Sequence, residues 1–180
     1  MPALEKINLA GFEIKLVLTQ PDSKSGRGMN INKSPVKPKS IELDIPVYQP
    51  EVLRNNKEAL NKITSKKADI LIVVAYGLII PEEILNLFNG HIYNIHASLL
   101  PRWRGAAPIH RAIEAGDKET GITIMKIVNQ LDAGPMIMKE KVPISAEDTT
   151  DFLSKKLSKL GASMINAFLK NIERGKVIKL

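Results

Sequence analysis

The residues that most constrain the fold form an apolar run from Ile70 to Ala75, the longest in the chain. A strand that is apolar on successive residues is typical of a parallel strand buried on both faces of a sheet. We therefore expect residues 68–75 to form such a strand. The run is far too short to cross a membrane, and the 180 residues fit one domain with a substantial core.

Segments typical of strands alternate with segments typical of helices along the rest of the chain. Spacing and turn residues predict strands over 13–19, 45–48, 91–96, 120–128 and 135–142, the last as an antiparallel or edge neighbour of 120–128. They predict helices over 1–10, 51–66, 106–115 and 148–173, with a short helix after Pro81. Prolines and glycines punctuate residues 20–39, which we expect to form a loop. This order favours an α/β fold with an open, mostly parallel, Rossmann-like sheet covered by helices on both faces.

Charge and composition narrow the class of partner only in part. The chain carries 26 Lys and Arg against 19 Asp and Glu, a formal net charge of +7. A basic surface suits nucleic acid or phosphate, and it equally suits a solvated face of lysine-rich helices. The sequence has no cysteine, which excludes disulfides, a thiol nucleophile and a thiolate metal site. No signal peptide is recognisable, so we expect a cytoplasmic protein that does not use a membrane.

The strand predicted over 91–96 ends in two polar residues with catalytic potential. Asn94 and His96 are two residues apart and should lie on the same face of that strand. An amide and an imidazole side by side can stabilise a carbonyl oxygen that gains negative charge. Asp132 follows the strand predicted over 120–128, so we expect it at the same carboxyl edge of the sheet. Taken alone, His96 would more often be a structural histidine and Asp132 a turn residue.

Other candidate motifs lack the spacing that their chemistry needs. Residues 26–28 contain two glycines but not the third glycine or the strand–turn–helix context of a phosphate-binding loop. His91, His96 and His110 do not have the spacing of metal ligands on a common face. We therefore expect no metal site.

Several motifs together carry a resemblance to a known family. They are Asn94-Ile-His96-Ala-Ser98-Leu-Leu-Pro101-Arg-Trp-Arg-Gly105-Ala-Ala-Pro108, Gly121-Ile-Thr123, Leu131-Asp132-Ala-Gly134, Thr19-Gln-Pro-Asp22, Ser34-Pro-Val-Lys37, Val74-Ala-Tyr76-Gly77-Leu78 and Ile144-Ser-Ala-Glu-Asp-Thr149. The block that begins at Asn94 is highly specific, and the similarity extends over nearly the whole chain. On these residues the chain resembles the folate-dependent formyltransferases, and most closely the catalytic domain of the members that act on methionyl-tRNA.

The resemblance implies a reaction and a set of site residues. The formyl donor would be 10-formyltetrahydrofolate, and the acceptor would be the α-amine of methionine on initiator tRNA. Asn94, His96 and Asp132 would be the catalytic trio, with Asp132 keeping His96 charged and oriented. The folate would contact Ser98, Leu99, Leu100 and Pro101, and an apolar slot for its pterin ring would be lined by Tyr76, Gly77, Leu78 and Leu131, which equally suit plain core packing. The tRNA acceptor stem would contact the basic residues Arg27, Lys24, Lys33 and Lys37.

The chain departs from the family pattern in two places. The family's first apolar strand with its glycine-containing loop has no counterpart, and neither has the C-terminal β-barrel domain that helps to hold tRNA. We therefore expect residues 1–180 to form a single, monomeric catalytic domain with a gap or an exposed edge in its sheet. Two alternatives stay open: a non-catalytic remnant of that enzyme, or a formyltransferase that acts on glycinamide ribonucleotide or a nucleotide amino sugar.

Overall fold

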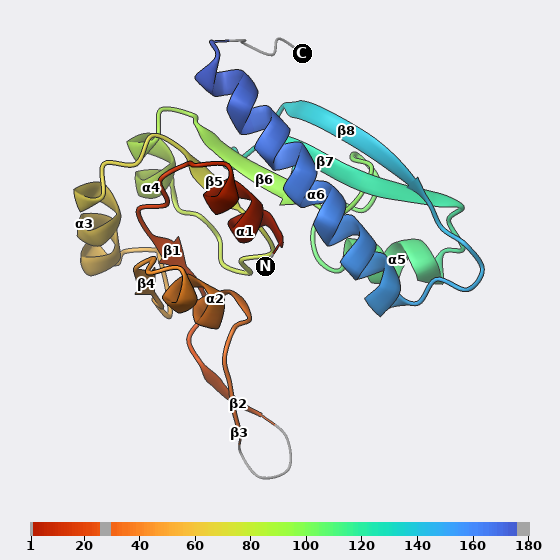
Figure 1. Ribbon diagram of the computed structural model, residues 1–180, viewed down its shortest axis with the longest axis horizontal. Helices are drawn as coiled ribbons and strands as arrows, with labels where there is room; N and C mark the ends of the chain where they lie inside the picture. Colours follow the sequence, from red (N-terminus) through yellow and green to blue (C-terminus); the bar gives the residue numbers. More distant parts are fainter. Residues whose placement is uncertain (1, 26–29, 176–180) are drawn as a thin grey trace.

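The computed structural model describes residues 2–25 and 30–175, and its largest sheet has four strands (Figure 1). In spatial order these are β5 (Leu71–Val73), β6 (Ile92–His96), β7 (Glu119–Lys126) and β8 (Met136–Pro143). The pair β5–β6 is parallel, whereas β6–β7 and β7–β8 are antiparallel. A separate parallel pair consists of β1 (Val17–Leu18) and β4 (Val47–Tyr48), and an antiparallel hairpin consists of β2 (Ser23–Ser25) and β3 (Asn30–Asn32).

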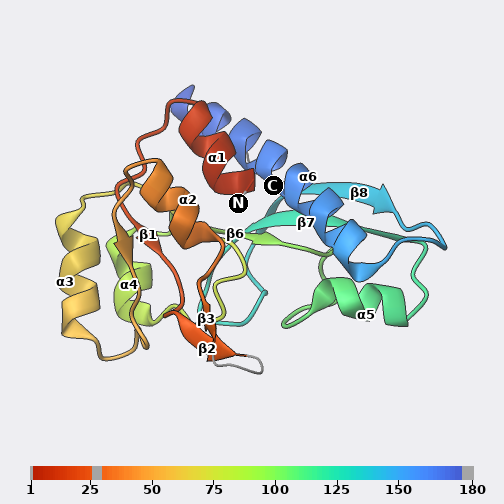
Figure 2. The same cartoon turned by 60° about the horizontal axis from the view of Figure 1, so that its bottom comes forward.

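Helices cover both faces of the four-stranded sheet, which confirms the predicted α/β class. The helices of the described residues are α1 (Pro2–Leu9), α2 (Val36–Glu42), α3 (Lys57–Ser65), α4 (Glu82–Leu87), α5 (Pro108–Glu114) and α6 (Thr150–Glu173). Of these, α2 lies beside β4 rather than on the four-stranded sheet. Figure 2 shows α1 and α6 side by side on one face of this sheet. Within the described residues, no helix is both long and apolar enough to cross a membrane.

The long helix α6 packs closely against the sheet at Gly161. The hydroxyl of Thr149 accepts a hydrogen bond from the N–H of Phe152 and caps the first turn of the helix. Gly161 then faces the sheet, where an added Cβ would lie 2.8 Å from Cγ2 of Ile95. The missing side chain at Gly161 is therefore what allows the helix axis to approach β6.

Alternate residues of β6 face two different hydrophobic clusters. Tyr93 and Ile95 belong to the cluster that includes α6, whereas Ile92 packs in the cluster that includes α4. Because side chains alternate along a strand, Asn94 and His96 share the face of Ile92, opposite α6. This face of the sheet is where the polar residues of interest lie.

The strand predicted over 68–75 is present, but its predicted burial on both faces is wrong. Only Leu71–Val73 forms a strand, its three residues are half-buried, and Val74 is 47% exposed. In the described part of the chain, β5 is the terminal strand of its sheet and pairs with β6 alone. A terminal strand lacks a second neighbour to exclude water, so its apolar side chains keep part of their surface in solvent.

The loop predicted over 20–39 is in part regular structure. The hairpin of β2 and β3 projects from the rest of the molecule (Figure 1), and α2 begins at Val36. Pro35 precedes this helix, and Pro38 is its third residue. The first N–H groups of a helix have no partner within it, so a proline there removes no hydrogen bond. The prolines that suggested a loop therefore mark the start of a helix.

Candidate active site

Asn94, His96 and Asp132 meet on the face of the sheet opposite α6. Oδ1 of Asp132 accepts a hydrogen bond from Nδ2 of Asn94 at 3.4 Å, and Oδ2 lies 3.6 Å from Nδ1 of His96. The side chains of His96 and Asp132 are only 6% and 11% exposed. Solvent therefore screens the interaction between carboxylate and imidazole much less than it would at the surface.

Asp132 reaches this place by a route that differs from the predicted one. The prediction placed it at a common carboxyl edge of the strands, but β7 runs antiparallel to β6, with Thr123 opposite His96. The end of β7 therefore lies beside the beginning of β6. The β7–β8 loop, residues 127–135, turns back to the sheet and presents Asp132 in a left-handed backbone conformation with φ of 44°.

One glycine binds the Asp132 carboxylate, and a second allows the loop that carries Asp132 to close. The N–H of Gly105 donates to Oδ2 of Asp132 at 2.8 Å. Gly105 has a φ of 81°, a conformation that glycine adopts without the penalty that a Cβ brings. A Cβ at Gly134 would collide with the carbonyl of Lys126, so a glycine is required where the β7–β8 loop closes.

The two ring nitrogens of His96 have different partners. Nε2 lies 2.9 Å from the carbonyl oxygen of Trp103. A carbonyl oxygen only accepts, so Nε2 carries a hydrogen and donates it. Nδ1 faces the carboxylate of Asp132, at 3.6 Å from Oδ2. The Trp103 carbonyl thus fixes the ring orientation and leaves Nδ1 as the nitrogen that faces Asp132.

The β6–α5 loop, residues 97–107, is held from inside by a buried hydroxyl. Thr123 donates to the carbonyl of Ser98 at 2.7 Å and accepts from the N–H of Leu100 at 3.2 Å. Ser98 and Leu100 are themselves buried, at 0% and 2% exposure, so their side chains shape the loop from within. Leu99 is half-buried and Pro101 is exposed, which leaves these two with side-chain surface open to a ligand.

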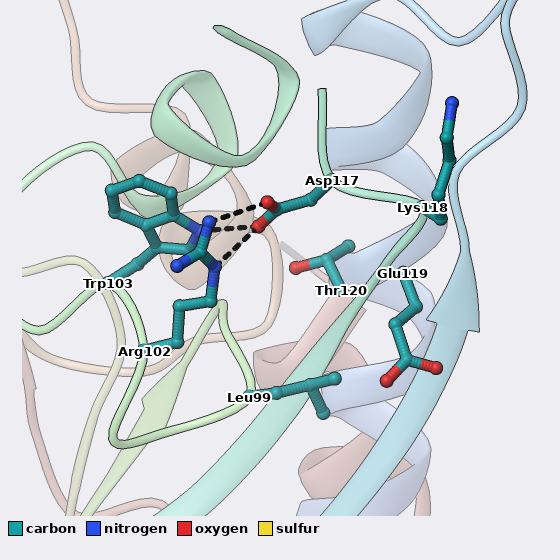
Figure 3. Close-up of a pocket in the computed structure, with 7 residues that line it drawn as sticks. All are labelled: Leu99, Arg102, Trp103, Asp117, Lys118, Glu119 and Thr120. Carbon is teal, nitrogen blue, oxygen red and sulfur yellow. Dashed lines mark hydrogen bonds and ion pairs between the residues drawn. The ribbon is translucent and has the colours of Figure 1, made fainter. Parts of the chain in front are cut away.

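A hollow of about 340 Å³ lies beside the same loop. Figure 3 shows Arg102, Trp103 and Asp117 pointing toward one another there. Nε and Nη2 of Arg102 donate to the two carboxylate oxygens of Asp117 at 2.8 and 2.7 Å, and Nε1 of Trp103 donates to Oδ2 at 2.7 Å. The hydrogen bonds from Arg102, and then that from Trp103, hold the pKa of Asp117 below its usual range.

The segment predicted to hold the pterin ring leaves the carboxyl end of β5. Since Val73 pairs with Asn94, this segment starts beside the trio. Tyr76 and Leu78 pack partly against the cluster of α3 and α4, and burial raises the pKa of Tyr76 to about 12. Gly77 is exposed, and Leu131, next to Asp132 in the chain, is 72% exposed.

The predicted tRNA-binding residues belong to the β2–β3 hairpin and the segment after it. Arg27 lies outside the described residues, and Lys24 is described only as part of the backbone of β2. Lys33 is exposed. Nζ of Lys37 lies 2.6 Å from Oδ2 of Asp22, so this lysine is already paired.

Sequence reasoning assigned no role to Trp103, Gly105, Thr123 or Asp117. Trp103 and Gly105 contact His96 and Asp132 through backbone groups, which leave no trace in a side-chain pattern. Thr123 looks like any other residue of a buried strand. The family motifs include Trp103, Gly105 and Thr123 but do not indicate these contacts. For Asp117 the signal was Gly116 before it, at the predicted end of a helix, where a cap fixes the chain direction.

Comparison with known proteins places the chain in a family. The model of the formyl transferase family matches residues 3–169. A methionyl-tRNA formyltransferase from Aromatoleum aromaticum is 52% identical over 178 residues, which cover 99% of this chain and 56% of that protein. One from Janthinobacterium sp. (strain Marseille) is 51% identical over 180 residues, 96% of this chain and 57% of that protein. The chain thus spans just over half the length of these curated relatives.

Solved structures of the family share the fold. The chain matches the phosphoribosylglycinamide formyltransferase of Anaplasma phagocytophilum with a TM-score of 0.81 and 26% identity, over 99% of this chain and 84% of that one. The corresponding enzyme of Bacillus halodurans gives a TM-score of 0.78 and 28% identity, over 94% and 87% of the two chains. The family match, the sequence relatives and the fold agree, and the chain belongs to the formyl transferase family.

Proposed function

We propose that this chain transfers a formyl group from 10-formyltetrahydrofolate to the α-amine of methionine on initiator tRNA. The observation that carries the proposal is the meeting of Asn94, His96 and Asp132 around one carboxylate, at 3.4 and 3.6 Å. The relatives that are 52% and 51% identical are named methionyl-tRNA formyltransferases, which supports this choice of acceptor.

Asn94 and His96 supply hydrogen bonds to the reacting oxygen. The folate donor supplies the formyl carbon, and attack by the amine nitrogen puts negative charge on the formyl oxygen. The contacts of Asn94 Nδ2 and His96 Nδ1 with Asp132 are long, so each donor can exchange that contact for one with the oxygen at little cost. Removing one such donor typically lowers a rate by ~10²–10³.

Asp132 acts as the general base for the proton that the amine loses. Its carboxylate accepts this proton, directly or through a water molecule, as the bond between the amine nitrogen and the formyl carbon forms. The bond between that carbon and the donor nitrogen then breaks, and the donor nitrogen takes up a proton. The hydrogen bond from the Gly105 N–H at 2.8 Å keeps the carboxylate in place throughout.

The residues around the trio suit a flat, largely apolar donor. Val74 and Ile79 follow β5, and Val128 and Leu131 lie in the β7–β8 loop. These four apolar side chains are exposed by 47%, 89%, 41% and 72% respectively. Exposed apolar residues on two loops that flank polar groups are what a pterin ring with a polar edge requires. Leu99 and Pro101 add surface on the β6–α5 loop.

The basic hairpin suits a nucleic-acid acceptor. The hairpin of β2 and β3 projects from the body (Figure 1), and the exposed Lys33 lies directly after it. Positive charge on a projecting element is suited to phosphates of an acceptor stem. This acceptor implies that the protein acts in the cytoplasm, where charged initiator tRNA is used, and we propose that it acts as a monomer.

The test is a side-by-side assay of acceptors with the purified 180-residue chain. Methionyl-tRNA, glycinamide ribonucleotide and a nucleotide amino sugar are each supplied with 10-formyltetrahydrofolate, and formylated product is measured. We expect product with methionyl-tRNA and a loss of turnover in Asn94→Ala, with Asn86→Ala on the exposed face of α4 as the matched control. Product with another acceptor alone would change the substrate, and no product with any amine would refute the proposal.

A further inference from the structure

We propose that Asp117 is a positioning residue that controls His96 and Asp132 through the β6–α5 loop. Asp117 touches none of the trio. It holds Arg102 and Trp103 by side-chain hydrogen bonds, and the backbone of the same loop contacts both His96 and Asp132. The predicted effect on turnover rests on the proposed function, whereas the predicted effect on the His96 ring does not.

Asp117 makes an unusually complete set of contacts for a carboxylate near the surface. Both of its oxygens accept from the guanidinium of Arg102, at 2.8 and 2.7 Å, and Oδ2 also accepts from the indole of Trp103 at 2.7 Å. The guanidinium in turn lies over the Trp103 ring, 4.2 Å from its centroid. A bidentate pair of arginine and carboxylate fixes the relative orientation of the two side chains, which a single ion pair does not. The side chain of Asp117 is 15% exposed, so solvent competes little for it.

The position of Asp117 is set by the end of α5. The N–H of Gly116 donates to the carbonyl of Ile113, and the N–H of Asp117 donates to the carbonyl of Ala112, both at 3.0 Å. With Gly116 at a φ of 67°, these two bonds form a Schellman cap, which fixes the residue that follows the glycine. Since β7 begins at Glu119, Asp117 lies on a short link between two regular elements.

The loop that Asp117 holds carries the groups that orient the trio. The carbonyl of Trp103 lies 2.9 Å from Nε2 of His96, and the N–H of Gly105 donates to Asp132 at 2.8 Å. Trp103 has a φ of 61°, an unfavourable conformation for a residue with a bulky side chain. The anchoring of its indole by Asp117 keeps this residue, and therefore its carbonyl, where His96 needs it.

Asp117→Asn tests the proposal with two spectroscopic readouts besides activity. Asparagine is uncharged, and its side-chain amide nitrogen cannot accept a hydrogen bond, so only its oxygen can accept from Arg102. We expect kcat for formyl transfer to fall by about 10- to 100-fold with little change in KM, as a small misplacement of catalytic groups predicts. The ¹⁵N signals of the His96 ring should shift, and the indole N–H resonance of Trp103, the single tryptophan of the chain, should move.

Two further variants make the result decisive. Arg102→Lys keeps the charge but loses the bidentate geometry of the guanidinium. This variant should fold because the Arg102 side chain is 57% exposed. We expect the same changes in kcat and in the His96 and Trp103 signals as for Asp117→Asn, but smaller. Glu119→Gln breaks the exposed pair with Lys141 and serves as the matched control, with no change at His96.

The outcomes separate this inference from the proposed function. An indole resonance that moves in Asp117→Asn and Arg102→Lys, while the His96 ring signals and kcat stay as in the wild type, would overturn the positioning role. If the wild-type chain transfers no formyl group to any amine, the proposed function fails. The ring signals of His96 then still decide whether Asp117 positions it.

Discussion

The carboxylate of Asp132 lies 3.6 Å from Nδ1 of His96, although the strand that leads to Asp132 runs antiparallel to the strand that carries His96. The contact exists because the β7–β8 loop folds back and the N–H of Gly105 holds the carboxylate at 2.8 Å. Two loops that leave different strands therefore share one acidic side chain. Changes at that side chain should affect chemistry more than folding.

Asp132→Asn should lower turnover strongly and leave the fold intact. The amide oxygen of asparagine can still accept from Gly105, but the negative charge beside His96 is lost. We expect a fall in kcat of about 10²- to 10⁴-fold, the usual range for a lost general base. Single-turnover assays measure the effect, and Asp69→Asn, at an exposed position before β5, is the control. A variant that keeps wild-type turnover would remove Asp132 from the mechanism.

Leu131→Ala should weaken binding of the folate donor without lowering stability. Leu131 is 72% exposed in the chain, so truncation costs the fold little, whereas covering this side chain with a pterin ring would bury it. A buried leucine side chain contributes ~1.5–3 kcal/mol, about a tenfold or larger change in Kd.

Leu9→Ala is the matched control for that experiment, because Leu9 is an equally apolar side chain on α1 with 83% exposure. Titration calorimetry with a non-reactive folate gives both affinities. Equal affinities of the two variants would show that Leu131 does not contact the donor.

Lys33→Ala should weaken tRNA binding and reduce its dependence on salt. Each phosphate contact that is lost lowers the slope of log K against log salt by about 1. Filter binding with methionyl-tRNA at several salt concentrations measures the slope. Lys155→Ala, an exposed position on α6, removes the same charge elsewhere and should leave the slope unchanged. A slope that drops equally in both variants would point to net charge rather than to a contact of the hairpin region.

Thr123→Val should destabilise the chain, whereas Thr120→Val should not. The Thr123 hydroxyl bonds the carbonyl of Ser98 and the N–H of Leu100, and valine would leave both groups buried without a partner, at about 1–3 kcal/mol each. In the described residues, the hydroxyl of Thr120 is buried and has no hydrogen-bond partner, so its removal relieves a cost. Urea unfolding of the two variants gives the comparison, and equal midpoints would contradict it.

The contribution of Asp117 to stability should depend on pH in a defined window. Hydrogen bonds from Arg102 and Trp103 lower the pKa of Asp117 in the folded state, below its ordinary unfolded value of about 3.9. When folding lowers the pKa of a carboxyl group, its charge stabilises the fold fully at pH values above the pKa of the unfolded state. This stabilisation is lost as the pH falls through the pKa of the folded state. The free energy of unfolding of the wild type should exceed that of Asp117→Asn by a constant amount between pH 5 and 8, and the difference should shrink below about pH 4. A difference that stays constant down to pH 3 would show that the charge of Asp117 does not stabilise the fold.

The sequence alone determined which residues share a face and which class of fold results. Side chains alternate along a strand by geometry, so Asn94 and His96 had to emerge on one side of β6. The alternation of strand and helix patterns likewise predicted the α/β class, because only a layered arrangement buries both kinds of apolar surface. The long helix α6 was predicted over 148–173 from the helical spacing of its apolar residues.

The antiparallel pairing of β7 with β8 was predicted and is confirmed, but the pairing of the other strands and the backbone groups around the site became visible only in the folded chain. The apolar pattern of residues 68–75 does not distinguish a central strand from a terminal one, since exposure depends on neighbours supplied by distant parts of the chain. The direction of β7 was equally hidden, because an antiparallel neighbour has the same residue pattern as a parallel one. The contacts of Trp103 with His96 and of Gly105 with Asp132 come from main-chain atoms that every residue possesses. No residue type signals them, and so only the folded chain could reveal them.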